Sequence, residues 1–336
     1  MRKTQRNVVL STALVASFAL TACTPELPTP EAPSETSSAL PALSAEQGVD
    51  IFASVGEVLA KADGDKKSAE LKTRVTGPAL KIRSAEYKIA AAAKDKDKSS
   101  AITELPVEMQ SMFVTTSEAW PRTVFAVSQR PQNLEPERFM VYTQDSAHDP
   151  YQLWAWFALF PGTTVPKFPA LEAGTTEVND LDETLKLKPE EVLKQYSELL
   201  KDASKANKAK FDVSKDAFYK EIDERRTYLE DAAKQIKGTY KEEFTVGKDW
   251  RALRTSDGGA VVVGTVETTG TLKGEKGAIV SPSAIEKAFL DKDKKSSNAL
   301  TVKRSAVVGI YVPAKDSEEK PRAIGRVLRT TGASIP

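Results

Sequence analysis

Residues 151–160 read YQLWAWFALF, and this apolar stretch is the strongest constraint on how the chain folds. Successive side chains of a strand point to opposite faces of its sheet. Both faces of this segment are apolar: one carries Tyr151, Leu153, Ala155, Phe157 and Leu159, and the other carries Trp154, Trp156, Ala158 and Phe160. Such a strand must be covered by other parts of the chain on both sides.

Trp154, Trp156 and Phe160 are the candidate binding residues that the sequence offers. A fully packed central strand would bury them as core, which is the simplest interpretation. A curved sheet that leaves a cavity beside its helix would instead place them around an apolar or aromatic ligand. An exposed aromatic patch that docks a partner is the third interpretation, and the sequence leaves all three open.

The segments before this stretch predict helices followed by strands. Apolar residues recur at helical spacing over 49–59, and a second helical pattern runs over 68–92 with a break at Gly77-Pro78. The period then changes to that of strands, which we expect at 112–116, 123–129, 138–144 and 151–160.

The segments after it repeat that order. Helical spacing predicts one helix around 192–200 and a longer one over 218–236 that ends at Gly238. Strands are expected at 240–246, 250–255, 260–272, 300–312 and 322–331. Asp257-Gly258-Gly259 predicts a hairpin turn, and 314–321 a longer charged one.

Helices followed by a meandering sheet indicate the α+β class. Because the order occurs twice, we expect two tandem domains, 44–175 and 176–336, each with helices packed on its own curved antiparallel sheet. The change of domain is expected within 171–188, where glycine and acidic residues interrupt the pattern. This order of elements resembles tandem cystatin-like or NTF2-like domains, a likeness of fold that carries no function.

The first 23 residues end in Leu20-Thr21-Ala22-Cys23, and Cys23 is the only cysteine. A basic start and an apolar run over 8–20 precede it. The pattern resembles the lipobox of bacterial lipoproteins, particularly those of actinobacteria and other Gram-positive bacteria. The resemblance implies that residues 1–22 are a cleaved signal peptide and that Cys23 carries the lipid that holds the protein on the extracytoplasmic face of the cell membrane. A transmembrane anchor and a soluble secretory signal are the alternatives. About 13 apolar residues are fewer than the ~20 that a span needs, and an ordinary secretory signal does not require a cysteine at its cleavage site.

Residues 23–43 are expected to be a tether, because prolines at 25, 28, 30, 33 and 41 prevent regular pairing. In a polyproline conformation of ~3.1 Å per residue it would reach about 60 Å.

Charge and cysteine content exclude several classes of function. Without residues 1–22, which hold three of the 48 basic residues and none of the 47 acidic ones, the chain has 45 basic and 47 acidic residues, a net charge of −2. We therefore expect no nucleic-acid partner. With its one thiol lipidated, the chain would form no disulfide or thiolate metal site, and no cofactor is indicated.

Catalytic patterns are weak throughout. His148 is the only histidine, and its neighbours Ser146 and Asp149 share one turn, where a catalytic triad does not easily form. The glycines at 270, 274 and 277 lack the order of a phosphate-binding loop. We therefore predict no catalytic residue and a non-enzymatic binding or structural module of the cell envelope, whose partner is an unidentified protein, glycan or lipid.

Two alternatives remain beside that prediction. The first is a carrier of an apolar ligand in a cavity between sheet and helix. The second is an enzyme that uses a carboxylate in an apolar pocket, for which Glu118 beside Trp120, or Glu137 near Phe139, would serve if burial raised its pKa.

Overall fold

The computed structural model describes residues 40–93, 101–116, 120–131, 135–291 and 296–336. By its internal contacts the chain divides into two units, Met1–Ser38 and Ala39–Pro336, and the described residues belong to the second. The expected signal peptide, Cys23, most of the tether and Glu118 lie outside the described residues. None of the helices in the described ranges is long and apolar enough to cross a bilayer.

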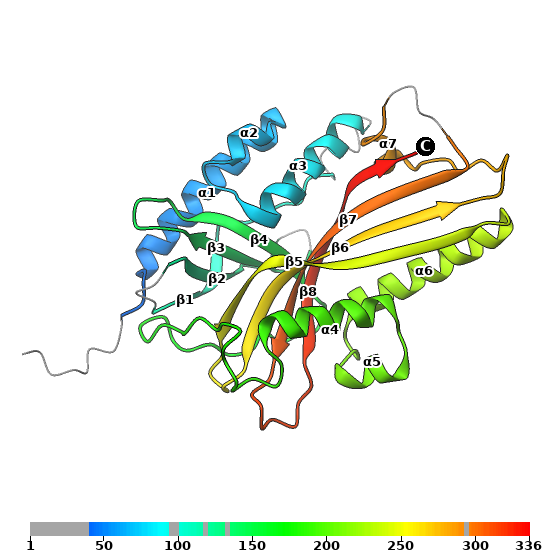
Figure 1. Cartoon of the computed structure of the whole chain (residues 1–336). Coiled ribbons are helices and arrows are strands. Elements are labelled where there is room, and N and C mark those ends of the chain that lie inside the picture. Colours follow the sequence, from blue (N-terminus) through cyan, green and yellow to red (C-terminus); the bar gives the residue numbers. More distant parts are fainter. Residues whose placement is uncertain (1–39, 94–100, 117–119, 132–134, 292–295) are drawn as a thin grey trace, which may run out of the picture. The chain divides into compact units, whose positions relative to one another are not determined.

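The fold is α+β, as the sequence predicts (Figure 1). The helices are α1 (Ala45–Asp65), α2 (Ser68–Leu71), α3 (Gly77–Ala92), α4 (Pro189–Lys201), α5 (Lys205–Lys210), α6 (Ala217–Gln235) and α7 (Ala284–Lys287). The strands are β1 (Met109–Val114), β2 (Arg122–Ser128), β3 (Arg138–Gln144), β4 (Gln152–Leu159), β5 (Thr239–Arg254), β6 (Ala260–Lys273), β7 (Ala299–Val312) and β8 (Arg322–Ser334).

Local sequence signals explain where the main helices begin. At the start of α1 the Ser44 side chain accepts a hydrogen bond from the Gln47 amide, and the Gln47 side chain accepts one from the Ser44 amide. Pro78 lies in the first turn of α3, where no amide hydrogen is needed. The Asp216 carboxylate caps α6 by accepting a hydrogen bond from the Tyr219 amide at 2.9 Å.

The strands form one antiparallel sheet in the order β1-β2-β3-β4-β8-β7-β6-β5, so the expectation of a separate sheet for each half is wrong. The halves join where β4 pairs with β8 through Ala158–Arg326 and Leu159–Gly325. Phe157 strengthens this junction, because its ring packs directly on Gly309 of β7 and Gly325 of β8. It fills the space that a side chain at either glycine would occupy. The predicted strands at 240–246 and 250–255 are likewise one strand, β5, with a register shift between Val246 and Trp250.

Helices cover both faces of the β5–β8 part of the sheet. Alternate residues of β6 belong to different cores: Val261 and Val263 pack in the core that contains α1 and α3, and Ala260 and Val262 in the core that contains α4 and α6. Figure 1 shows α1–α3 and α4–α6 on opposite sides of these strands. The two halves of the chain therefore share one continuous structure.

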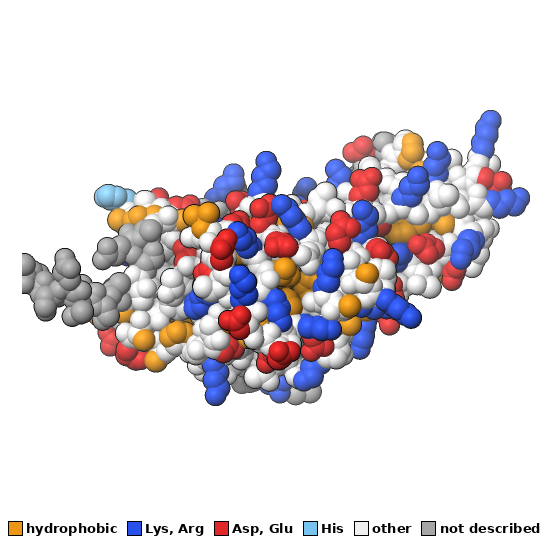
Figure 2. Space-filling model, turned by 60° about the horizontal axis from the view of Figure 1, so that its bottom comes forward, with side chains coloured by type: hydrophobic (Ala, Val, Ile, Leu, Met, Phe, Trp, Pro, Cys, Tyr) orange, Lys and Arg blue, Asp and Glu red, His pale blue; other side chains and the backbone are white. Residues whose placement is uncertain are grey.

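The visible surface carries both signs of charge. On the face shown in Figure 2, Lys and Arg side chains are interspersed with Asp and Glu side chains. This mixture gives no broad field of one sign on that face.

Candidate functional site

The three aromatic residues proposed from sequence lie in packed cores. The exposed fractions are 3% for Trp154, 1% for Trp156 and 6% for Phe160. Trp154 lies against Gly77 at the start of α3, and the Arg251 guanidinium lies 4.8 Å from its ring centre. The Arg83 guanidinium is 5.4 Å from the ring centre of Trp156. These contacts occupy both indole rings with protein groups.

The alternation expected along β4 is interrupted. The pairing between β3 and β4 shifts between Val141 and Tyr142, so that Ala155 and Leu153 are their partners and Trp154 is an extra residue. Strict alternation of side chains therefore does not hold across Trp154, although the strand is buried on both faces as expected.

Ser146, His148 and Asp149, in the turn around the only histidine, do not form a catalytic triad. His148 is exposed, and its backbone amide donates a hydrogen bond to the Ser146 hydroxyl at 3.4 Å. That hydroxyl donates in turn to the Asp149 carboxylate at 2.6 Å. The Ser146 hydroxyl therefore donates to Asp149 and not to the imidazole of His148. Across the described ranges, no group of three His, Cys, Asp or Glu side chains is arranged to hold a metal ion.

Burial raises the pKa of two described carboxylates that the sequence did not suggest for an enzyme, Glu177 and Asp216. Glu137 pairs with Arg130 at 3.2 Å. Burial raises the pKa of Glu177, which accepts a hydrogen bond from the Thr123 hydroxyl at 2.9 Å. The nearby Arg251 opposes that shift, so Glu177 has a basic neighbour and is not a lone acid in a dry pocket.

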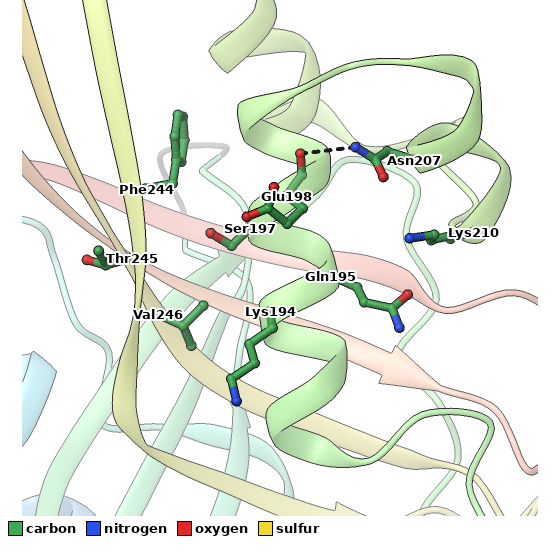
Figure 3. A pocket seen from close by; sticks show the side chains of 9 residues that line it. All are labelled: Lys194, Gln195, Ser197, Glu198, Asn207, Lys210, Phe244, Thr245 and Val246. Atoms are coloured by element: carbon green, nitrogen blue, oxygen red, sulfur yellow. Dashed lines mark hydrogen bonds between the residues drawn. The ribbon is translucent and has the colours of Figure 1, made fainter.

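A cleft of about 540 Å³ lies between α4, α5 and β5 (Figure 3). Its lining comes from these three elements: Lys194, Gln195, Ser197 and Glu198 of α4, Asn207 and Lys210 of α5, and Phe244, Thr245 and Val246 of β5. Its size lies within the usual range for small-ligand sites, ~300–1,000 Å³. Sequence analysis missed every one of these residues.

The amphipathic pattern of α4 explains why one side of this helix is available. Residues at helical spacing, Val192, Leu193, Tyr196, Leu199 and Leu200, are buried against the sheet. Leu193 lies where a Cβ on Gly264 would stand, so this glycine lets α4 approach β6 closely. The polar positions of the helix are thereby directed away from the core and into the cleft.

Several polar groups of the cleft are held by their neighbours. The Asn207 amide donates to the carbonyl oxygens of Glu198 at 3.4 Å and Asp202 at 3.0 Å, which ties α5 to the end of α4. The Gln195 amide donates to Glu191 at 2.8 Å, and Lys194 pairs with Glu190 at 2.6 Å. The cleft therefore combines orientated amides with charges of both signs.

The family model described as Domain of unknown function (DUF8094) matches residues 39–334. The chain belongs to this family. The matched range coincides with the second unit and spans both halves of the sheet, so the DUF8094 domain is the whole eight-stranded structure. No curated protein and no solved structure matches the chain.

Phe244 and Val246 give the cleft of this DUF8094 domain an apolar wall. They occupy alternate positions of β5, so they share one face of the strand, and both are half-buried. The Gln195 and Glu198 side chains of α4 line the same cleft. An aromatic side chain, amides and a carboxylate in one cleft suit a ligand that has both C–H faces and hydroxyl groups.

Proposed function

We propose that this protein is a lipid-anchored lipoprotein on the extracytoplasmic face of the cell membrane, and that its DUF8094 domain is a non-enzymatic module that binds a glycan of the cell envelope. The observation that carries the binding role is the cleft whose lining combines the Phe244 ring with the polar side chains of Gln195, Glu198 and Asn207.

The anchor follows from the sequence Leu20-Thr21-Ala22-Cys23. Each buried acyl CH₂ contributes ~0.8 kcal/mol, so a diacylglycerol on Cys23 holds the protein far more firmly than a single chain does. A proline-rich tether between Cys23 and Ala45 then gives the domain reach toward envelope polymers.

The glycan follows from the chemistry of the cleft. A sugar ring presents C–H groups on its faces and hydroxyl groups around its edge, so an aromatic wall and planar polar side chains recognise both. Phe244 supplies the wall, and Gln195, Glu198 and Asn207 supply donors and acceptors. Lys194 and Lys210 at the same cleft favour a glycan that also carries acidic groups.

Labelling with a fatty-acid analogue tests the anchor. The wild-type protein should incorporate the label and fractionate with membranes, and Cys23→Ala should do neither. Label retained on Cys23→Ala would contradict the anchor.

Calorimetric titration with soluble β-1,4-linked oligomers of N-acetylglucosamine and N-acetylmuramic acid, whose lactyl groups are acidic, tests the binding role. Phe244→Ala and Gln195→Ala should each weaken binding at least tenfold, which corresponds to ~1.4 kcal/mol. Glu243→Ala is the matched control, because this exposed residue is next to Phe244 on β5 but outside the cleft. Equal affinity of Phe244→Ala and wild type, or no binding by wild type, would refute the glycan role.

A further inference from the structure

We propose that the outer edge of β1 binds an extended peptide of another protein, as an added strand whose apolar residues are flanked by basic ones. The site is a second groove, of about 470 Å³, and it shares no lining residue with the α4–α5–β5 cleft. The inference does not depend on the proposed glycan role.

The groove follows the edge of the sheet. Six consecutive residues, 107–112, line it, and β1 is the terminal strand in the sheet order of the described residues. An edge strand offers backbone donors and acceptors to an incoming strand. A lining made of successive residues of one edge strand therefore fits an extended backbone better than it fits a compact ligand.

The groove is covered from both faces of the sheet. Met112 contacts α1 at Gly48, where a Cβ would lie 2.3 Å from the Met112 sulfur. The next residue, Phe113, points to the opposite face and stacks on Phe168 with ring centres 4.1 Å apart. Because α1 residues and Leu171 both line the groove, it opens at the strand edge between these two layers.

At the C-terminal end of β1, other segments of the chain already pair with the outer edge of the strand. The Val114 carbonyl accepts a hydrogen bond from the Thr175 amide at 2.8 Å, and the Thr115 carbonyl accepts one from the Ala42 amide at 2.9 Å. These segments end the groove at one side and leave the 107–112 stretch facing it. An added strand would extend the same pattern of backbone pairing.

The lining is apolar and partly exposed. Val49 is 65% exposed and Val107 is 44% exposed, and both line the groove together with Phe52 and Met109. Burying these side chains under a partner would remove apolar surface from water.

The charges at the groove identify the occupant. Glu108 lines it, the exposed Glu46 and Asp50 flank Val49 on α1, and no Lys or Arg lines it. These acids attract basic residues at the ends of a bound peptide.

The same charges disfavour two other occupants. The tether of this chain carries Glu26, Glu31 and Glu35 but no basic residue, and its prolines have no amide hydrogen to donate. A second copy of the chain would bring the same acidic residues and its own α1 into the groove.

Fluorescence anisotropy with a labelled peptide tests the proposal on residues 24–336. The probe is a peptide of alternating valine and threonine between lysine pairs, and it should bind at least tenfold tighter than the same peptide between glutamate pairs. Val49→Asp should weaken binding at least tenfold, whereas Ala60→Asp, at an exposed site of α1 outside the groove, should not. Glu108→Lys should reduce the preference for the lysine-flanked peptide.

Backbone methylation of the peptide tests strand addition itself. Methylating the amides of one alternate set should abolish binding, and methylating the other set should not, because only one set faces β1. Equal effects of both sets, or no effect of Val49→Asp, would overturn the proposal. Displacement of the peptide by a fatty acid would reassign the groove to a lipid. Self-association of the wild type that is lost in Val49→Asp would reassign it to a second copy of the chain. Tighter peptide binding after deletion of residues 24–39 would reassign it to the tether. Phe244→Ala should leave peptide binding unchanged, which separates this test from that of the glycan role.

Discussion

Replacement of Glu86 by glutamine is expected to destabilise the whole domain, because this fully buried carboxylate links the two halves of the chain. Glu86 of α3 accepts hydrogen bonds from the Arg83 guanidinium at 2.8 Å and from the Thr103 hydroxyl at 2.5 Å. It also accepts one from Arg329 of β8 at 2.9 Å. One side chain thus holds a helix of the first half to the last strand of the second.

The magnitude follows from what the substitution leaves behind. Glutamine has no charge, and its NH₂ group would face cationic donors. Breaking a buried ion pair by removing one partner costs ~3–5 kcal/mol. Arg83, which is 1% exposed, retains Asp63 at 3.3 Å, and Arg329 is partly exposed, so we expect a value near 3 kcal/mol, the lower end of that range.

Thermal denaturation measures this cost. A loss of about 3 kcal/mol corresponds to a decrease in Tm of roughly 5 °C for a domain of about 300 residues. Glu224→Gln, on the exposed surface of α6, is the control and should stay within about 0.5 kcal/mol of wild type. A double-mutant cycle of Glu86→Gln with Arg329→Met should give a coupling of at least ~0.5 kcal/mol. A Glu86→Gln loss below 1 kcal/mol, or strict additivity in the cycle, would refute this reasoning.

Three further predictions concern the core, the pH dependence and the halves. Gly309→Ala should lower the free energy of unfolding by ~1–3 kcal/mol, because the new Cβ would lie 2.2 Å from Cζ of Phe157. Gly64→Ala, in open space on α1, should instead raise it by ~0.4–1 kcal/mol. Equal melting temperatures of the two variants would contradict this prediction. Burial raises the pKa of Glu177, so the folded protein keeps this proton to higher pH than the unfolded chain. The group therefore lowers stability as pH rises from the usual carboxyl pKa, about 4, through the raised one. Glu177→Gln should remove that decline in melts at increasing pH, and an unchanged slope would contradict the assignment. The fragments 44–175 and 176–336, produced separately, should lack independent cooperative melts, because β4 and β8 belong to one sheet; two cooperative melts would show that the junction is dispensable.

Most elements of the fold are predictable from local sequence. The strand patterns around 138–144 and 260–272 correspond to β3 and β6 within one residue, and α3 begins at Gly77, although α2 ends earlier than predicted, at Leu71. These predictions succeed because side-chain periodicity and turn residues act over a few positions. The pairing of β4 with β8 joins residues more than 160 positions apart, and no local signal specifies it.

The candidate cleft was not predictable for a related reason. Gln195 and Asn207 are ordinary polar residues on short solvent-facing stretches, and their types do not distinguish a ligand wall from a hydrated surface. Only the packing of α4 on β6 and the course of α5 bring them into one cleft with Phe244. The one conspicuous aromatic segment, 151–160, fills the interior instead. A strong apolar pattern thus marked the core of this chain and gave no information about its surface.

The short β4–β8 junction explains why the domain must behave as a single unit despite its repeated order of elements. Two residue pairs of backbone pairing would hold two halves weakly. Phe157 adds a ring that fills the space above Gly309 and Gly325, and Glu86 adds a buried charge that is satisfied only when α3 and β8 are both in place. Opening the junction would expose the Phe157 ring to water and would leave the Glu86 carboxylate and its arginine partners unpaired. Each of these changes costs several times more free energy than the loss of a surface contact. Cooperativity in this fold therefore depends on side chains at the junction more than on the hydrogen bonds that define its sheet.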